Sequence, residues 1–167
     1  TNACVFLHEG NIASGETSEE LWMVMRTPDY DQTDRTTDPP TAYSSVSRDG
    51  GRTWSVAKPE PDLHNAKSKV YFGRSSNGTH IYVYSDGPPQ REKAPGFPNG
   101  GRTSLRYKTK MPGDTWSEEK TFFDAGIKNS YPTLIEIASG DFRCVWDTGT
   151  PDTPRTHISF GKLRISP

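Results

Sequence analysis

The octet Ser47-Arg48-Asp49-Gly50-Gly51-Arg52-Thr53-Trp54 constrains the fold of this chain more than any other stretch. Asp49-Gly50-Gly51 has turn chemistry, because glycine adopts positive φ angles readily and an aspartate side chain accepts hydrogen bonds from the N–H groups of a turn. Strand-like residues lie on both sides, over 42–48 and 53–56. The octet therefore predicts a β-hairpin whose turn is folded by Asp49 and anchored by Trp54. No second carboxylate follows at the spacing of a calcium loop, so we expect no metal there.

A second, weaker copy of the octet lies at 109–116. It keeps the last glycine, the threonine and the tryptophan of the first copy, whereas Met111 stands where the first copy has Asp49. Trp116 follows Trp54 by 62 residues. Recurrence of a turn motif at this spacing predicts an internal structural repeat.

The composition is typical of many short strands joined by turns. Of the 167 residues, 31% are hydrophobic, and 15 glycines and 14 prolines are spread along the chain. Four tryptophans, seven tyrosines and seven phenylalanines argue against a disordered chain. Residues 17–20 resemble the start of a helix, but they lead directly into the strand-like stretch 21–25. We therefore expect an all-β fold.

The predicted strands fall into three consecutive units. In the first unit (1–57), we expect strands over 3–8, 21–26, 42–48 and 53–56. In the second (68–122), the strands are expected over 68–74, 80–85 and 103–109. The third (130–166) contains three expected strands and no fourth, over 131–137, 142–147 and 157–165. Small sheets repeated in series are typical of β-propellers, which have about four to eight blades.

Charge and motifs argue against several other classes of protein. The net charge is −1, and the basic residues are not clustered, so we expect no nucleic-acid partner. No apolar run is long enough for a membrane-spanning helix. The four histidines show no metal-ligand spacing, and we expect no cofactor. Cys4 and Cys144 lie in apolar strands, where two buried thiols or a single disulfide are both compatible with the sequence.

The octet and its weaker copy resemble the Asp box, or BNR repeat, of the sialidase superfamily. In that family the box joins the two outer strands of a propeller blade, on the face away from the active site. The resemblance implies that the chain forms about three blades of a six-bladed sialidase-like propeller and corresponds to its C-terminal half. The N-terminal half would come from the same or a separate chain. A secreted, lysosomal or periplasmic location is compatible with this family.

Four residues match the active-site pattern of the family in their order along the chain. Glu9, in His8-Glu9-Gly10-Asn11, opens the first unit, and Arg26 ends the following strand. Arg102 precedes the third strand of the second unit, and Tyr131 opens the third unit. The resemblance implies that Tyr131 and Glu9 are catalytic and that Arg26 and Arg102 bind substrate. Arg91 is an alternative to Arg102, since it lies in the proline-rich loop that Arg102 follows.

The chemistry of sialidases explains these residue types. Arginines bind the carboxylate of sialic acid through charge-assisted hydrogen bonds. A carboxylate nucleophile would be repelled there, and sialidases use a tyrosine instead. A neighbouring carboxylate has to accept the phenol proton, because the pKa of tyrosine is about 10. The family's acid, an aspartate, and the first arginine of its triad would lie in the N-terminal half, so we expect this chain alone to be catalytically incomplete.

Other functions are compatible with the same residues. One is a glycan-binding propeller without catalytic activity, and another is a propeller glycosidase or lyase that acts on a different sugar. Each candidate also has a purely structural interpretation. Glu9, Arg26 and Arg102 are then solvated surface charges, and Tyr131 packs at the edge of a blade.

Overall fold

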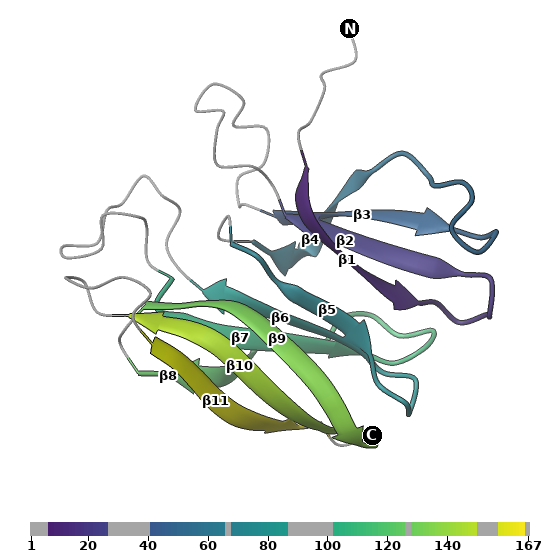
Figure 1. Ribbon diagram of the computed structural model, residues 1–167. Helices are drawn as coiled ribbons and strands as arrows, with labels where there is room; N and C mark the ends of the chain where they lie inside the picture. Colours follow the sequence, from purple (N-terminus) through teal and green to yellow (C-terminus); the bar gives the residue numbers. More distant parts are fainter. Residues whose placement is uncertain are drawn as a thin grey trace, which may run out of the picture.

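The computed structural model describes residues 7–26, 41–65, 68–86, 102–125, 128–149 and 157–165. These residues form three antiparallel sheets and no helix, which confirms the all-β prediction (Figure 1). The first sheet contains β1 (His8–Ser14), β2 (Leu21–Arg26), β3 (Thr41–Ser47) and β4 (Lys58–His64), in that order. The second contains β5 (Tyr71–Arg74), β6 (His80–Asp86), β7 (Ser104–Lys110) and β8 (Lys120–Asp124). The third contains β9 (Lys128–Ala138), β10 (Asp141–Gly149) and β11 (His157–Arg164).

The sheets pack face to face, with the second sheet in the middle. Successive side chains of β6 point to opposite faces, as in any strand. Ile81 and Val83 pack in a core with Trp146 of the third sheet, whereas Tyr82 and Tyr84 pack in a core with residues of the first sheet. The second sheet is therefore buried on both faces, as expected for a propeller blade with a neighbour on each side.

The first strands of the three sheets, β1, β5 and β9, lie side by side and begin at the same end of the molecule (Figure 1). Asn11 in β1 contributes to this contact, because its Nδ2 donates to the carbonyl oxygen of Val70, 3.1 Å away, just before β5. Residues near the starts of these strands therefore share one end of the assembly.

The predicted strand over 53–56 is wrong. Asp49 accepts hydrogen bonds from both the backbone N–H and the hydroxyl of Thr53, so Thr53 belongs to the turn and not to a strand. The outer strand is β4, which begins at Lys58 and includes Pro59 and Pro61. Prolines are tolerated there because β4 is an edge strand, where a missing N–H leaves no ladder bond unmade.

Strands β1 and β8 also differ from the prediction. The strand expected over 3–8 falls mostly outside the described residues, and β1 starts where that strand was expected to end. Within β1, a side chain at Gly10 would have little room, because the Met25 Cγ lies 3.3 Å from where a Cβ would be. The second sheet has an outer strand, β8, that the sequence analysis did not assign. The described part of the third unit has three strands, as predicted.

Candidate active site

Glu9 and Arg26 form an ion pair across β1 and β2. Antiparallel pairing sets His8 opposite Arg26, which brings the start of β1 next to the end of β2. The Arg26 Nη1 atom lies 2.7 Å from the Glu9 Oε2 atom. Arg26 is only 8% exposed, so it is not a solvated surface charge. A guanidinium this deeply buried needs a partner, and Glu9 supplies it.

Arg102 and Tyr131 form the second pair. Arg102 precedes β7, Tyr131 lies near the start of β9, and the guanidinium carbon is 5.5 Å from the centroid of the phenol ring. This is within the range of a cation–π interaction. Arg102 is 6% exposed and is therefore also buried. The alternative arginine, Arg91, lies outside the described residues.

Glu9 and Tyr131 share an unusual backbone conformation. Among the described residues, they are the two non-glycine residues with a positive φ, at 44° and 58°. Both lie at irregularities in strand pairing: the β1–β2 register shifts between His8 and Asn11, and the β9–β10 register shifts opposite Tyr131. The left-handed region costs an L-residue about 1–2 kcal/mol, and such strain is concentrated at functional sites.

The structure thus brings the four candidates together as two pairs at one end of the molecule. Glu9 and Arg26 belong to the first sheet, Arg102 to the second, and Tyr131 to the third. Strand β5 lies between β1 and β9, so the pairs stand on either side of it. Within the described ranges, no group of three His, Cys, Asp or Glu side chains could hold a metal ion, and no helix could span a membrane.

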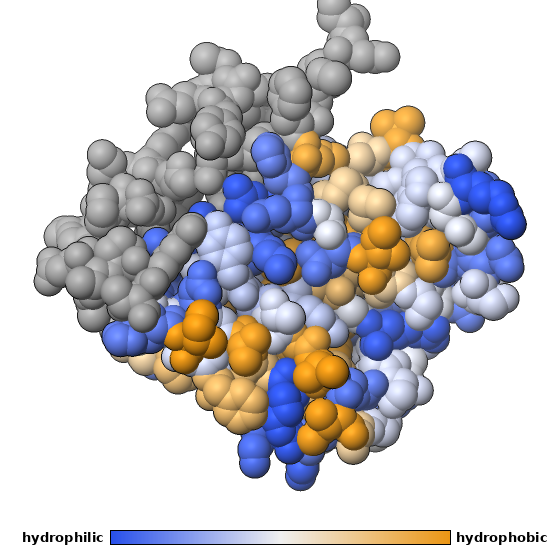
Figure 2. Space-filling view, viewed as in Figure 1, coloured by the Kyte–Doolittle hydropathy of each residue, from blue (hydrophilic) through white to orange (hydrophobic). Residues whose placement is uncertain are grey.

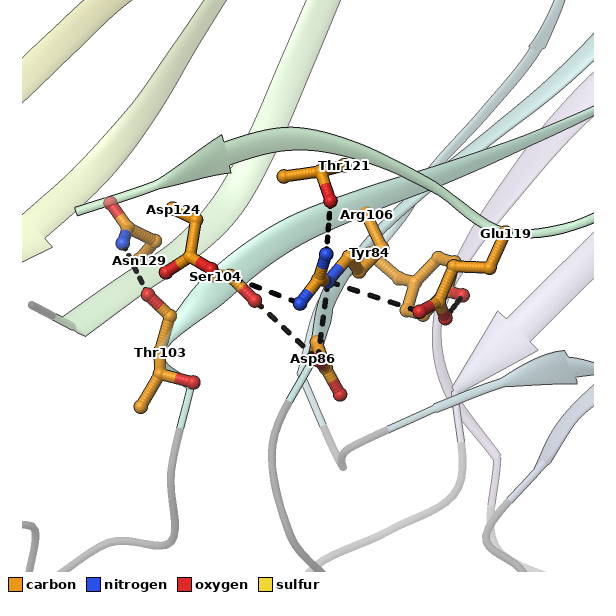
Figure 3. Close-up of polar contacts among 9 residues, drawn as sticks. All are labelled: Tyr84, Asp86, Thr103, Ser104, Arg106, Glu119, Thr121, Asp124 and Asn129. Carbon is orange, nitrogen blue, oxygen red and sulfur yellow. Dashed lines mark hydrogen bonds and ion pairs between the residues drawn. The ribbon is translucent and has the colours of Figure 1, made fainter. Parts of the chain in front are cut away.

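A charged network that no sequence motif indicated lies close to Thr103, the residue after Arg102 (Figure 3). The Arg106 Nε atom is 3.2 Å from the Asp86 Oδ2 atom and 3.8 Å from the Glu119 Oε1 atom. The Arg106 Nη2 atom is 3.9 Å from the Asp124 Oδ2 atom. These charges are separated by up to 38 residues along the sequence and meet only through strand register, so no local motif signals them.

This network supports the segment that carries Arg102. The carbonyl oxygen of Asp86 accepts a hydrogen bond of 3.0 Å from the N–H of Thr103. Next to it, the Tyr84 hydroxyl donates to the Glu119 carboxylate. Burial and the Glu119 carboxylate raise the pKa of Tyr84, so its phenol stays protonated and remains a donor.

The 47–54 turn lies at the opposite end of the first sheet. Leu21 is paired with both Ser14 and Ser47, at the ends of β1 and β3, whereas Glu9 lies near the start of β1. Asp49 accepts bonds from the Thr53 hydroxyl at 2.6 Å and from the Thr53 N–H and the Ser47 hydroxyl at 2.8 Å each. These hydrogen bonds lower the pKa of Asp49 to about 2, and those from Thr53 contribute most. The prediction that Asp49 folds a turn is confirmed.

Comparisons with known proteins agree with this architecture. The family model for the BNR repeat-like domain matches residues 12–144. The solved intramolecular trans-sialidase from leech superposes with a TM-score of 0.65 at 15% identity, over 93% of this chain and 23% of that one. The intramolecular trans-sialidase of Ruminococcus gnavus gives 0.63 at 13% identity, over 94% and 32%. The NanB sialidase of Streptococcus pneumoniae gives 0.64 at 13% identity, over 94% and 23%.

At these identities the structural matches show the fold and not the chemistry. The chain spans about a quarter to a third of the length of these proteins, which makes it part of a propeller. No curated protein sequence matches it. Because the family model covers more than half of the sequence, this chain belongs to the family of BNR repeat-like domains.

Proposed function

We propose that the complete protein is a retaining exo-glycosidase of the sialidase type, which releases terminal sialic acid or a related acidic sugar from glycans. The observation that carries the proposal is the pair of strained residues, Glu9 and Tyr131, each in contact with or close to a buried arginine. Those residue types suit a substrate that carries a carboxylate on its reacting carbon. The similar solved structures named as sialidases and trans-sialidases support the same substrate class.

In the proposed reaction, Arg26 and Arg102 bind the carboxylate of the sugar. The Tyr131 oxygen attacks the anomeric carbon, and Glu9 accepts the phenol proton as the bond forms. A carboxylic acid outside this chain protonates the departing glycan oxygen. Water then attacks the anomeric carbon of the tyrosyl-bound sugar and gives a proton to the conjugate base of that acid, while the bond to Tyr131 breaks and Glu9 returns the phenol proton. The two successive inversions retain the configuration. For proton transfer, the Glu9 carboxylate must come within about 2.6–3.2 Å of the Tyr131 hydroxyl.

The partner that completes the site, on this proposal, is the rest of the propeller. One face of the third sheet exposes a row of apolar side chains over β9–β11 (Figure 2). They are Ile135, Ile137, Val145, Ile158 and Phe160, with exposed fractions between 41% and 71%. Cross-strand pairs such as Val145 with Phe160 hold them on one face of the sheet. The opposite face of this sheet packs against the second sheet, so a further blade is the natural cover for this one.

The test is an assay of the complete protein with Tyr131→Phe. With a fluorogenic sialoside, turnover should fall by more than about 1,000-fold, because the nucleophile is lost while the ring that packs near Arg102 remains. Binding of free sialic acid should be retained. Tyr107→Phe, a half-buried tyrosine of β7, serves as the matched control and should keep full turnover.

Two details sharpen the assay. Product analysis should cover both free and anhydro sialic acids, since two of the similar structures are intramolecular trans-sialidases. A panel of neutral and other acidic glycosides should run in parallel. Near-normal turnover by Tyr131→Phe contradicts the mechanism. Sialic acid binding without turnover of any glycoside by the native protein supports the glycan-binding alternative instead.

A further inference from the structure

We propose that Asn129 is a positioning residue that sets the place of Arg102 relative to Tyr131. The inference rests on the proposed function for its meaning in catalysis, but its structural basis is independent. Asn129 lies in β9, two residues before Tyr131, and is fully buried. Neither its burial nor its partners can be read from the sequence around it.

Asn129 joins β9 to three other segments of the chain. Its backbone N–H donates to the Arg102 carbonyl oxygen at 2.6 Å. Its side-chain Nδ2 donates to the Thr103 carbonyl oxygen, also at 2.6 Å, as drawn in Figure 3. Its Oδ1 accepts from the Trp146 indole Nε1 at 2.9 Å, and its carbonyl oxygen accepts from the Ser85 hydroxyl at 2.9 Å. We call these four bonds the Asn129 bracket.

The bracket requires an amide side chain. An amide supplies a donor for the Thr103 carbonyl and an acceptor for the Trp146 N–H at the same time. An aspartate carboxylate would face the Thr103 carbonyl oxygen without a proton to donate, and an apolar residue would leave buried polar atoms unsatisfied. In either case a buried donor or acceptor is left unsatisfied, which lowers the stability of the fold by more than an average hydrogen bond contributes.

The bracket acts directly on Arg102. Residues 102 and 103 precede β7 and belong to no strand, so the ladder of the second sheet does not hold them. Their backbone is held by Asn129 on one side and by the Asp86 carbonyl on the other. Because Asn129 and Tyr131 lie on the same strand, the bracket couples the segment that carries Arg102 to the strand that carries the phenol. A displacement of about 1 Å at such a site can lower the rate by about 100-fold.

The experiment uses the complete protein and separates a positioning role from a loss of stability. Asn129→Ala breaks the side-chain bonds of the bracket. Asn65→Ala is the matched control, because Asn65 is also a fully buried asparagine but lies before β5, outside the bracket. Arg102→Lys keeps the charge and removes the guanidinium.

The first measurement is the NMR correlation of arginine Nε–Hε groups, which requires no activity. The Arg102 signal is assigned by its absence in Arg102→Lys. Asn129→Ala should shift or broaden this signal and leave that of Arg106 in place, whereas Asn65→Ala should change neither. An unchanged Arg102 signal in Asn129→Ala overturns the inference.

The second measurement is the affinity for free sialic acid and for its methyl ester, by calorimetry. Asn129→Ala should weaken binding of the acid by about 10-fold or more and affect the ester much less. In the Arg102→Lys background, Asn129→Ala should cause less than about a twofold further loss, because both changes act on one contact. Full, additive losses in both backgrounds contradict positioning through Arg102.

The two proposals fail in different ways. If the native protein binds no sialic acid but Asn129→Ala still shifts the Arg102 signal, the positioning role stands and the proposed substrate is wrong. If sialic acid binds and turns over, while Asn129→Ala leaves both the signal and the affinity unchanged, the proposed function stands and the positioning role is wrong.

Discussion

The positive φ of Tyr131 leads to a prediction about stability that reverses the usual order of two substitutions. At an ordinary strand position, glycine is less stable than alanine by about 0.5–1 kcal/mol, because it loses more backbone freedom on folding. Tyr131 has a φ of 58°, in the left-handed region. There an alanine carries a penalty of about 1–2 kcal/mol that glycine avoids. The difference predicts that Tyr131→Gly is more stable than Tyr131→Ala by about 0.5–1 kcal/mol.

The comparison cancels the loss of the ring, since both variants remove it. The assay is urea unfolding of the complete protein, monitored by tryptophan fluorescence. Free energies of unfolding are compared only where the variants share the same dependence on urea concentration. Thr133 provides the control position, because it is exposed, belongs to the same strand and does not have a positive φ. There, Thr133→Gly should be the less stable of the pair. If alanine is favoured over glycine at both positions by the same amount, Tyr131 is not strained and our reasoning about the backbone is wrong.

Three further predictions concern other parts of the molecule. Phe160→Asp should destabilise the complete protein by about 2 kcal/mol or more in thermal unfolding, because the proposed further blade would no longer bury an aromatic ring against β9–β11. An unchanged melting temperature contradicts the proposal that a blade covers this face. The stability advantage of the native protein over Asp49→Asn should be constant near neutral pH and shrink as the pH falls from about 4 toward 2. The reason is that the pKa of Asp49 in the folded protein, about 2, lies below the ordinary 3.8, so the stabilisation by the carboxylate is lost when it is protonated. An advantage that persists at about pH 2 contradicts this. Burial raises the pKa of the free Cys144 thiol to about 12, so iodoacetamide near pH 8 should label it only after the protein unfolds. Mass spectrometry can follow the labelling, and rapid labelling of the native protein contradicts this prediction.

Much of the fold follows from local chemistry and was therefore predictable. The turn at 47–54 needs only residues within the octet, since Asp49, Ser47 and Thr53 bond to one another. Its weaker copy keeps the glycine at the position that requires a positive φ: Gly51 and Gly113 have φ values of 89° and 78°. Short-range signals of this kind indicate where strands end and that the sheets repeat.

The outer strands were the least predictable elements. Strand β4 contains two prolines, and only its place at the edge of the first sheet makes them acceptable. The sequence has no means of saying which strand is at an edge. For the same reason, the exposed apolar residues of β11 look like any buried strand until the sheet packing is known.

The sequence by itself determined the repeat, the all-β class and, through the family resemblance, the order of the candidate site residues. Only the tertiary structure decided that Glu9 pairs with Arg26, that Arg102 lies near the Tyr131 ring, and that Asn129 ties their segments together. The physical reason is range. A turn is stabilised by atoms a few residues apart, whereas these contacts join residues up to 29 positions apart and depend on strand register and on the packing of one sheet against the next.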